Sequence, residues 1–522
     1  MSRFTAIDLF AGIGGFRTAV EANDGRCVGF SEIEPNAIDV YLKNYNSSKE
    51  ENYGDITKIK ELPPHDLLTA GVPCQSWSIA GKNLGFKDDR GKLWNDAIYL
   101  LNQSRPKAFI FENVKGLVDP RNRDAFQYIL ERIKNAGYYA DYYVLNSSDY
   151  GVPQSRVRVY IIGFKDKEYQ DCFELPEKVK TPILEHFLDD KCVHLKVDSQ
   201  NKETLRSHSH LPKTGCTSLS SNQNGYNDYF LFNDIRNGST TLHTWDLLDC
   251  SEREREICTL LLKNRRKSEY GPLDGNPLSL KQLQDLDINI TQSDVDNLTS
   301  RGIFKIEPYK YRVVGNINNL SSDELQLLSY VNDGFLVPDY LLSLKDVRTS
   351  ISGISNIIHT LVERGFLECV EYRYDFKYTK ISTGLFGVNR IFLPSSSFFP
   401  TLVASDSNDY VTNIGIDCDD IMLYRNTFIE EVYKKNNYRK ITKKEACRIQ
   451  GFPDTFILPD NRSKWMKLLG NSVSVPLIKL LVQSICNTGV FENKVHPCTA
   501  KKANDTSISD AHKAPVQLRL FL

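Results

Sequence analysis

The stretch Phe4-Thr5-Ala6-Ile7-Asp8-Leu9-Phe10-Ala11-Gly12-Ile13-Gly14-Gly15-Phe16 decides the fold of the first part of this chain. Its residues 4–10 form an apolar run typical of a buried strand. The glycines after it predict a turn whose backbone approaches a ligand closely, and residues 17–23 continue as a helix. A strand, a glycine-rich turn and a helix are the opening of a nucleotide-binding α/β unit.

Acidic residues follow at the ends of the next two predicted strands. Residues 27–32 form a strand that ends in Glu32, about 20 residues past the glycine turn, where a carboxylate typically binds ribose hydroxyls. Residues 54–57 are predicted as a third strand end, where Asp55 accepts from an adenine amino group or caps the next turn. The fingerprint Gly-x-Gly-x-x-Gly is missing, which disfavours a nicotinamide enzyme. The βαβαβ pattern fits an adenosyl ligand without a pyrophosphate.

The composition predicts a globular protein of two or more domains, because 522 residues exceed one ordinary core. The net charge of -1 gives no overall basic field, but a local basic cleft is enough to bind nucleic acid. We identify no signal peptide and no membrane-spanning run, and twelve scattered cysteines form no Cys-x-x-Cys pair. We therefore expect reduced thiols, no metal site and a cytoplasmic location.

A cysteine lies on a predicted loop at the end of another strand. Residues 65–70 form the strand, Gly71 and Pro73 end it, and Cys74 follows. Such a cysteine is a candidate nucleophile if a charged neighbour stabilises its thiolate, although an isolated Pro-Cys is more often a small buried residue in a turn. The polar, glycine-rich residues 81–94 are predicted as a loop that touches a substrate.

Three charged residues lie at the ends of two later predicted strands. The strand 108–111 ends in Glu112, at the same sheet edge as Cys74, where a carboxylate can protonate or hydrogen-bond a substrate ring. Arg156 and Arg158 alternate at the start of a later strand and therefore point to one face. Two arginines on a core strand need anionic partners, because burying an unpaired charge is costly.

In their order along the chain, these residues resemble the motifs of the cytosine-5 DNA methyltransferase family, in its prokaryotic restriction–modification type. The resemblance covers residues 1–165 and 396–486. Ile33 replaces the aromatic residue that many members have after the second-motif glutamate. The runs that carry the resemblance are Asp8 to Phe16, Glu32, Asp55, Pro73-Cys74-Gln75-Ser76, Glu112-Asn113-Val114, Gln154-Ser155-Arg156-Val157-Arg158, residues 438–453 and Gly470-Asn471-Ser472-Val473.

The resemblance implies an α/β fold: a Rossmann-like S-adenosylmethionine-dependent methyltransferase domain with a large inserted mixed α/β target recognition domain. It divides the chain into a first catalytic and cofactor-binding part (1–165), the recognition domain (166–395), a return to the catalytic domain (396–486) and a flexible tail (487–522).

The activity implied is DNA (cytosine-5-)-methyltransferase, acting on a flipped-out cytosine of duplex DNA through a covalent Cys74 adduct. Glu112 would hydrogen-bond the ring, and Arg158 or Arg156 would hold its carbonyl oxygen and the adjacent phosphate. The residues predicted to be catalytic are Cys74, Glu112, Arg156 and Arg158. Those predicted to bind S-adenosylmethionine are Phe10, Gly12, Ile13, Gly14, Gly15, Glu32, Ile33, Asp55, Ile56, Gly71, Pro73, Leu93, Asn471 and Val473. Those predicted to bind DNA are Gln75, Ser78, Arg90 and Gln154.

The partners implied are double-stranded DNA and a cognate restriction endonuclease that acts separately, with the methyltransferase a monomer at the bacterial nucleoid. Two other functions stay open. A branch of the family methylates tRNA, which the long middle region disfavours. A DNA-binding scaffold with a dead active site is disfavoured by the intact candidate catalytic residues.

The middle of the chain contains no family motif. Residues 199–225 are predicted as a linker, 233–238 as a tight turn, and 250–267 as a helix whose basic end, 263–267, meets phosphates or only solvent. Residues 279–314 and 341–381 are each predicted to form two helices followed by a hairpin. This order of elements is typical of a winged helix. Gln292, Ser293 and Asp294 would open one recognition helix, and residues 350–355 would precede another; base reading and plain packing are both open.

The last residues suggest a helix and then a tail. Residues 471–486 are predicted as an apolar helix beside the first strand, and 491–515 as disordered. Gln517-Leu518-Arg519-Leu520-Phe521 resembles a bacterial sliding-clamp-binding motif, with a terminal segment folded onto the body as the alternative.

Overall fold

The computed structural model describes residues 2–73, 89–197, 229–232, 240–273, 275–315, 320–344, 353–379 and 384–492, without the side chains of 89–92 and 342. The chain packs into two compact units. The first comprises Met1–Pro182, Pro400–Asp406 and Lys443–Leu522, and the second Ile183–Phe399 and Ser407–Thr442.

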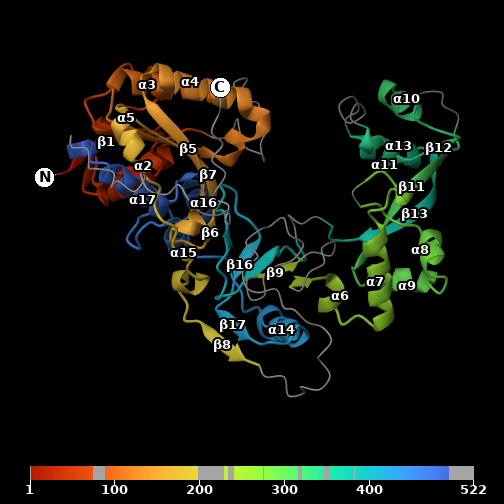
Figure 1. Cartoon of the computed structure of the whole chain (residues 1–522). Helices are drawn as coiled ribbons and strands as arrows, with labels where there is room; N and C mark the ends of the chain where they lie inside the picture. The colour runs from red at the N-terminus through yellow and green to blue at the C-terminus, as the bar shows by residue number, and fades with distance from the viewer. Residues whose placement is uncertain are drawn as a thin grey trace, which may run out of the picture. The chain divides into compact units, whose positions relative to one another are not determined.

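The first unit is built on a six-stranded sheet with the order β2-β1-β3-β4-β7-β5 (Figure 1), in which β7 runs antiparallel to both neighbours. Strands β1, β3 and β4 are apolar almost throughout, because parallel strands are covered on both faces. Its strands are β1 (Phe4–Leu9), β2 (Gly25–Ser31), β3 (Leu67–Gly71), β4 (Ala108–Val114), β5 (Tyr139–Asn146) and β7 (Val157–Phe164), and the short β6 (Gln154–Ser155) lies outside this sheet.

Helices cover this sheet on both faces. Helices α3 (Asp89–Ser104) and α4 (Arg123–Asn135) pack on β3 and β4 through a core that includes Trp94 and Phe111. Helix α1 packs against α17, where the Asn23 amide donates to the carbonyl of Lys479. The remaining helices of this unit are α1 (Gly15–Glu21), α2 (Pro35–Tyr45), α5 (Lys167–Cys172), α15 (Lys443–Gln450), α16 (Arg462–Asn471) and α17 (Val475–Asn487).

The prediction of an α/β domain that opens with strand, glycine-rich turn and helix is confirmed, but two local predictions were wrong. Residues 54–57 form no strand end; Asp55 instead caps the 3-10 turn η2 (Ile56–Lys58), so β3 is the third strand in the chain. Residues 89–94 of the predicted loop 81–94 belong to helix α3, and residues 81–88 lie outside the described residues. The apolar helix predicted for 471–486 is present, although it begins at Val475 and packs on α1.

The packing boundaries differ from the predicted domain boundaries of 165 and 396. The first unit extends to Pro182, and Ser407–Thr442 belongs to the second unit although we expected it in the catalytic body. The reason is apolar burial: Tyr424 and Phe428 of this segment pack on Phe230. The tail also begins later than the predicted residue 487, because Phe491 is buried and stacks on Phe4.

One segment, Arg462–Asn487, is long and apolar enough to cross a membrane by length and composition alone, which our sequence analysis overlooked. Helices α16 and α17 share it, with residues 472–474 between them, and 61% of its most apolar window is buried inside the protein. Such burial is typical of the core helix of a globular protein.

The second unit contains a sheet with the order β10-β9-β14-β16, a two-stranded sheet of β8 and β17, and helix α14. These elements share one core, which includes Phe230, Phe232 and Phe428. Their bounds are β8 (Val193–Lys196), β9 (Tyr229–Phe232), β10 (Thr241–Leu242), β14 (Arg390–Phe392), β16 (Asp409–Val411), β17 (Ile414–Asp417) and α14 (Ile421–Thr427), which the π-helix η9 (Phe428–Tyr433) follows.

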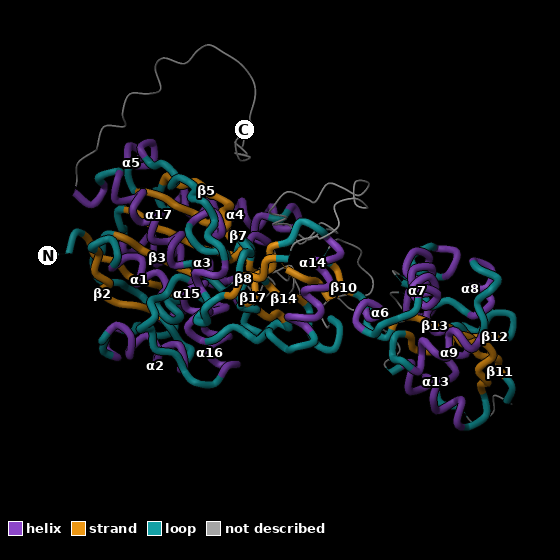
Figure 2. Tube along the Cα trace, turned by 90° about the horizontal axis from the view of Figure 1, so that it is seen from below, coloured by secondary structure: helices purple, strands orange, loops and turns teal. Residues whose placement is uncertain are grey.

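Residues 251–376 of this unit form an internal repeat around a pair of long strands (Figure 2). The first repeat consists of α7 (Glu252–Asn264), α8 (Leu280–Leu286), α9 (Gln292–Ser300) and β11 (Phe304–Val313). The second consists of α10 (Ser322–Leu328), β12 (Phe335–Leu336), α11 (Pro338–Ser343), α13 (Ile354–Glu363) and β13 (Leu367–Phe376).

The two repeats use the same contacts. Helices α9 and α13 each end at an arginine, followed by a glycine with φ of +73°. Arg301 pairs with Glu254 at 2.8 Å, and Arg364 pairs with Glu324 at 2.6 Å. Both glutamates also close the capping box at the start of the first helix of their repeat.

The strands of the two repeats pair with each other about a local two-fold axis. Phe304 lies opposite Phe376, and Val313 lies opposite Leu367, so equivalent residues exchange places across the ribbon. Each hydrophobic core accordingly contains residues from the strand of the other repeat, Tyr374 in one and Tyr311 in the other.

The two predicted hairpins of the winged-helix pattern were therefore wrong. Each pair of predicted short strands is one continuous strand, with its antiparallel partner supplied by the other repeat. Asp294 caps α9 by accepting from the backbone of Thr291, and Gln292 donates to Tyr374. The predicted linker 199–225 and turn 233–238 lie outside the described residues, as do residues 350–352.

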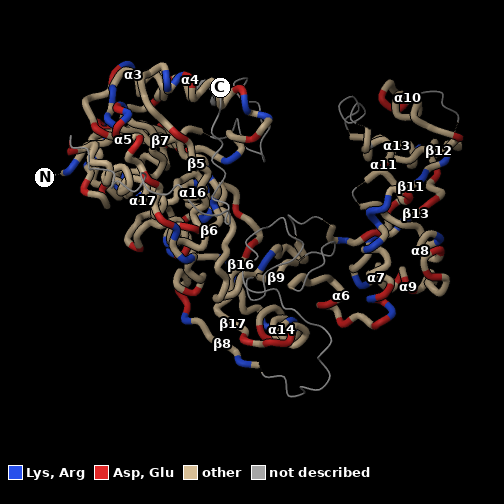
Figure 3. Tube along the Cα trace, in the orientation of Figure 1, with Lys and Arg blue, Asp and Glu red and all other residues tan. Residues whose placement is uncertain are grey.

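The basic run 263–267 contributes partly to the protein's own packing. Arg265 is buried and pairs with Asp375 at 2.7 Å, and Lys267 lies 3.7 Å from Glu269. Basic and acidic residues alternate over α7, α8, α9 and the ribbon (Figure 3). Contact of this run with phosphates stays a prediction.

We expect Asp375→Ala to destabilise the repeat by about 3–5 kcal/mol, because it leaves the buried Arg265 charge without its partner. Glu368→Ala is the matched control on the same strand, since its ion pair with Arg312 is half exposed on both sides and contributes less than ~1 kcal/mol. Urea unfolding of the full chain, followed by circular dichroism, measures both. Equal losses from the two variants would contradict the assignment.

Candidate active site

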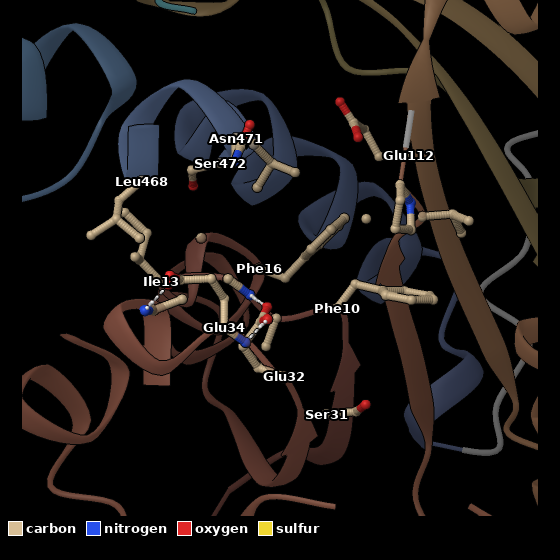
Figure 4. A pocket seen from close by; sticks show the side chains of 18 of the residues that line it. Phe10, Ile13, Phe16, Ser31, Glu32, Glu34, Glu112, Leu468, Asn471 and Ser472 are labelled. Atoms are coloured by element: carbon tan, nitrogen blue, oxygen red, sulfur yellow. Dashed lines mark hydrogen bonds between the residues drawn. The ribbon is translucent and has the colours of Figure 1, made fainter. Parts of the chain in front are cut away.

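A cavity of about 330 Å³ opens at the carboxyl ends of β1, β2 and β3, at the edge of the sheet where ligands collect in open α/β folds. Residues from both ends of the chain line it, because the last turn of α16 and residues 471–473 complete its wall. Figure 4 shows Glu32 and Glu112 on different sides of this cavity, which Leu468 and Ile13 also line.

The glycine-rich turn is fixed by contacts that only glycine permits at Gly14. Its φ is +87°, and a Cβ there would run into the ring of Tyr45. The Tyr45 hydroxyl donates to the Gly14 carbonyl at 2.6 Å. Phe10 also has a positive φ, of 53°, which is uncommon outside glycine and typical of ligand clamps.

Glu32 connects the turn to the end of β2. Its carboxylate accepts from the backbone N–H groups of Gly12, Ile33 and Glu34, each at 2.8 Å. A carboxylate has about four lone-pair sites, so acceptor capacity is left for a ligand hydroxyl. Glu32 therefore has a structural role and can also bind a ribose.

Asp55 and Ile33 lie beside it. Asp55 accepts from the backbone and hydroxyl of Thr57 through one oxygen, and these bonds hold the pKa of its carboxyl below the usual value. It is thus both a cap and a pocket residue. The Ile33 side chain is 68% exposed and lines the cavity, a position from which it could cover a flat ring.

Glu112 and Arg158 form an ion pair at another wall of the cavity, with 3.2 Å between Oε1 and Nε. Both lie on neighbouring antiparallel strands, β4 and β7, and both side chains are largely buried. Among the described residues, the buried Oε1 of Glu112 has no hydrogen-bond partner and only the ion pair with Arg158. Glu112 therefore keeps hydrogen-bonding capacity for a substrate.

Asn113 is a residue whose role we did not predict. It is buried, and its side-chain amide donates to the Val72 carbonyl at 3.1 Å. Val72 lies two residues before Cys74, so this bond fixes the root of the predicted catalytic loop relative to Glu112. Its place within the motif Glu112-Asn113-Val114 was the available signal.

The prediction that Gln154 contacts DNA was wrong. The side chain is fully buried, its amide nitrogen donates to Gln450 and to the Ile449 carbonyl, and its oxygen accepts from the Leu402 backbone. Gln450 in turn donates to the carbonyls of Ser472 and Val473. Gln154 therefore belongs to a buried network that holds the C-terminal wall of the cavity.

Arg156 belongs to the same network. Its guanidinium donates to the carbonyls of Leu402, Gly470 and Ser472, at 3.2, 3.1 and 2.7 Å. We expected Arg156 and Arg158 to need anionic partners together; the structure gives the anion to Arg158 and carbonyl oxygens to Arg156. Arg156 is thus a positioning residue.

Of the residues predicted to bind the cofactor, all except Gly14 line the cavity. Residues that were not predicted to bind the cofactor also line the cavity, among them Phe16, Ser31, Glu34, Lys467, Leu468 and Ser472. Cys74, Gln75 and Ser78 lie outside the described residues, and Arg90 lies in α3 with its side chain undescribed.

The sheet order, the glycine-rich first turn and the acid at the end of β2 define a Rossmann-like methyltransferase fold. The chain belongs to the family of C-5 cytosine-specific DNA methylases, whose model matches residues 4–487. It is thus a DNA cytosine-5-methyltransferase.

Curated relatives agree over nearly the whole chain. The type II methyltransferase M.HgiBI of Herpetosiphon aurantiacus is 37% identical over 95% of this chain and 99% of its own length. M.BanI of Aneurinibacillus aneurinilyticus is 29% identical over 93% and 96%. Among solved structures, the Entamoeba histolytica methyltransferase EhMeth covers 93% of this chain and 99% of its own, with 13% identity and a TM-score of 0.45.

We expect Asp8→Asn to change how stability depends on pH. Burial raises the pKa of Asp8 to about 8, so the folded protein keeps a proton that the unfolded chain releases near pH 4. The wild type therefore loses stability as the pH rises from about 4 to 8, by about 1.4 kcal/mol per pH unit.

The asparagine variant should lack this slope, because it has no proton to release and can still accept from Thr69. Urea unfolding of both proteins from pH 5.5 to 8 measures the difference between their slopes. Parallel pH profiles would show that Asp8 is ionised in the folded state.

We expect Arg156→Met and Arg158→Met to impair different properties of the enzyme. The first removes three buried hydrogen bonds and should lower both thermal stability and cofactor affinity. The second removes the partner of Glu112 and should lower kcat at least about 100-fold with near-normal cofactor affinity. Calorimetric binding and steady-state kinetics separate the two, and identical profiles would refute the distinction.

Proposed function

We propose that this protein transfers a methyl group from S-adenosylmethionine to carbon 5 of a cytosine within a specific short sequence of duplex DNA. The observation that supports it best is the Glu112–Arg158 pair, which faces a cofactor-sized cavity in a member of this family. A carboxyl group at this position that carries a proton is suited to donate a hydrogen bond to the acceptor nitrogen 3 of the cytosine ring.

The cavity fits the cofactor. Glu32 has acceptor capacity for ribose hydroxyls, Asp55 for an adenine amino group, and Ile33 presents an exposed apolar face for the adenine ring. When bound, S-adenosylmethionine supplies an electrophilic methyl group on a positively charged sulfur. Gly71, Pro73 and Leu93 line the side of the cavity nearest the predicted catalytic loop.

The chemistry that we propose uses Cys74 as nucleophile. Its thiolate forms a bond to cytosine carbon 6, which makes carbon 5 nucleophilic. As this attack moves negative charge into the ring, Glu112 donates a proton to ring nitrogen 3, and Arg158 holds both Glu112 and the ring carbonyl oxygen. After carbon 5 is methylated, its proton leaves to a base, the Cys74–carbon bond breaks and the proton on nitrogen 3 returns to Glu112, so the aromatic ring and the thiolate are restored.

Since both faces of a cytosine are covered in a duplex, we propose that the base is flipped out before attack. Gln75 and Ser78 would meet DNA from the loop that follows Cys74, with Arg90 on a phosphate. The second unit, including the paired repeats, would read the sequence, and helices α9 and α13 present polar side chains for it.

The biological role that we propose is protection of host DNA in a type II restriction–modification system, in the bacterial cytoplasm, beside a separately acting cognate endonuclease. The relatives that match nearly the whole chain are named type II methyltransferases, which supports this role. We retain a monomeric state and clamp binding through Gln517 to Phe521 as proposals; this terminal motif lies outside the described residues.

We expect the wild type to label duplex DNA from radioactive S-adenosylmethionine, with bisulfite sequencing locating the label at cytosines of one short context. Cys74→Ala should bind the cofactor normally but transfer less than about 0.1% of the label, because the covalent step is lost. Duplex containing 5-fluorocytosine should form a covalent complex with the wild type alone.

Transfer RNA serves as the competing substrate in the same assay. If tRNA is labelled and DNA is not, the substrate is tRNA and the proposed DNA substrate is wrong. DNA binding without labelling of either nucleic acid would favour the scaffold alternative.

A further inference from the structure

We propose that Lys467 binds the carboxylate of the amino-acid end of the cofactor, and so selects the complete amino-acid group. This inference rests on the proposed cofactor and adds a residue that the sequence motifs do not contain. Lys467 lies on α16, one turn before Asn471, and its side chain lines the cavity.

The charges of the cavity point to this role. Among the side chains that the structure describes, three cationic ones line it, namely Arg156, Arg158 and Lys467. Arg156 is occupied by three carbonyl oxygens, and Arg158 by Glu112. No ion pair or hydrogen bond engages the Lys467 side chain among the described residues, so it is the cation that remains available to a ligand anion.

The cofactor has one anionic group and two cationic ones. The carboxylate needs a cation or several donors, whereas the ammonium and the sulfonium favour acidic surroundings. Glu32, Glu34 and Asp55 line the same cavity, and Glu32 and Asp55 are the residues proposed above for the ribose and adenine. A carboxylate is disfavoured beside them by like charge and favoured near Lys467.

The position of Lys467 fits the far end of such a ligand. Its neighbour Leu468 and Ile13 of the glycine-rich turn both line the cavity (Figure 4), so α16 and this turn contribute to the same site. The Lys467 side chain is exposed, and α16 is anchored behind it by the buried Trp465 and Met466. A flexible ammonium at the mouth can reach a carboxylate without being buried itself.

The test compares S-adenosylmethionine with decarboxylated S-adenosylmethionine, which lacks only the carboxylate. Titration calorimetry measures the Kd of both for the wild type, Lys467→Met and Lys467→Arg. Lys464→Met is the matched control, because Lys464 is exposed on the same helix but does not line the cavity.

We expect Lys467→Met to raise the Kd for S-adenosylmethionine about 10-fold and the Kd for decarboxylated S-adenosylmethionine less than about 2-fold. The first change is the size expected for the loss of one solvent-accessible charged hydrogen bond. Lys467→Arg should retain most of the affinity, and Lys464→Met should change neither ligand.

Equal weakening of both ligands, or of neither, overturns the proposal. A salt-dependent loss of duplex affinity with unchanged cofactor binding would instead assign Lys467 to a DNA phosphate. If the wild type binds neither ligand, the proposed cofactor is wrong, and this outcome is distinct from failure of Lys467 alone.

Discussion

The buried contact between Arg156 and the carbonyl oxygens of Gly470 and Ser472 holds the active site together. These groups are more than 300 residues apart in the sequence, and a whole folded unit is inserted between them. Gln154 and Gln450 extend the contact to Leu402 and Val473. Because every partner is buried, losing one leaves others unsatisfied, which makes the closure of the cavity all-or-none.

The same cavity holds two carboxylates in different electrostatic surroundings. Glu32 is held by backbone N–H groups, whereas Glu112 is held by a guanidinium, so two carboxylates at the same sheet edge meet different surroundings. The first keeps a fixed position beside the glycine turn. The second lies beside the Arg158 guanidinium at the cavity wall. A single pocket can thereby present carboxylates to a cationic cofactor and a guanidinium to a transient anion.

The sequence predicted the catalytic unit well because its signals are local: the glycine turn, Glu32 and the apolar strands each follow from a few adjacent residues. The predictions were wrong where the contact partners of a residue are distant in the sequence. Gln154 looked like a DNA contact, but its acceptors and donors come from α15 and Leu402. The ribbon looked like two hairpins, since nothing in residues 302–314 reveals that Leu367–Phe376 supplies the partner strand. The prediction of a strand end at 54–57 was wrong for a local reason, because Asp55 caps the 3-10 turn that follows it.

The interlocked strands β11 and β13 also limit how this protein can change over generations. Each core between residues 251 and 376 contains side chains from the other repeat, as in a domain-swapped dimer fused into one chain. Recombination that exchanged a single repeat with a related gene would join two cores whose shapes were never selected together. We therefore expect the two repeats to be exchanged together. New specificities would arise by replacing both repeats at once or by changing only their surface residues.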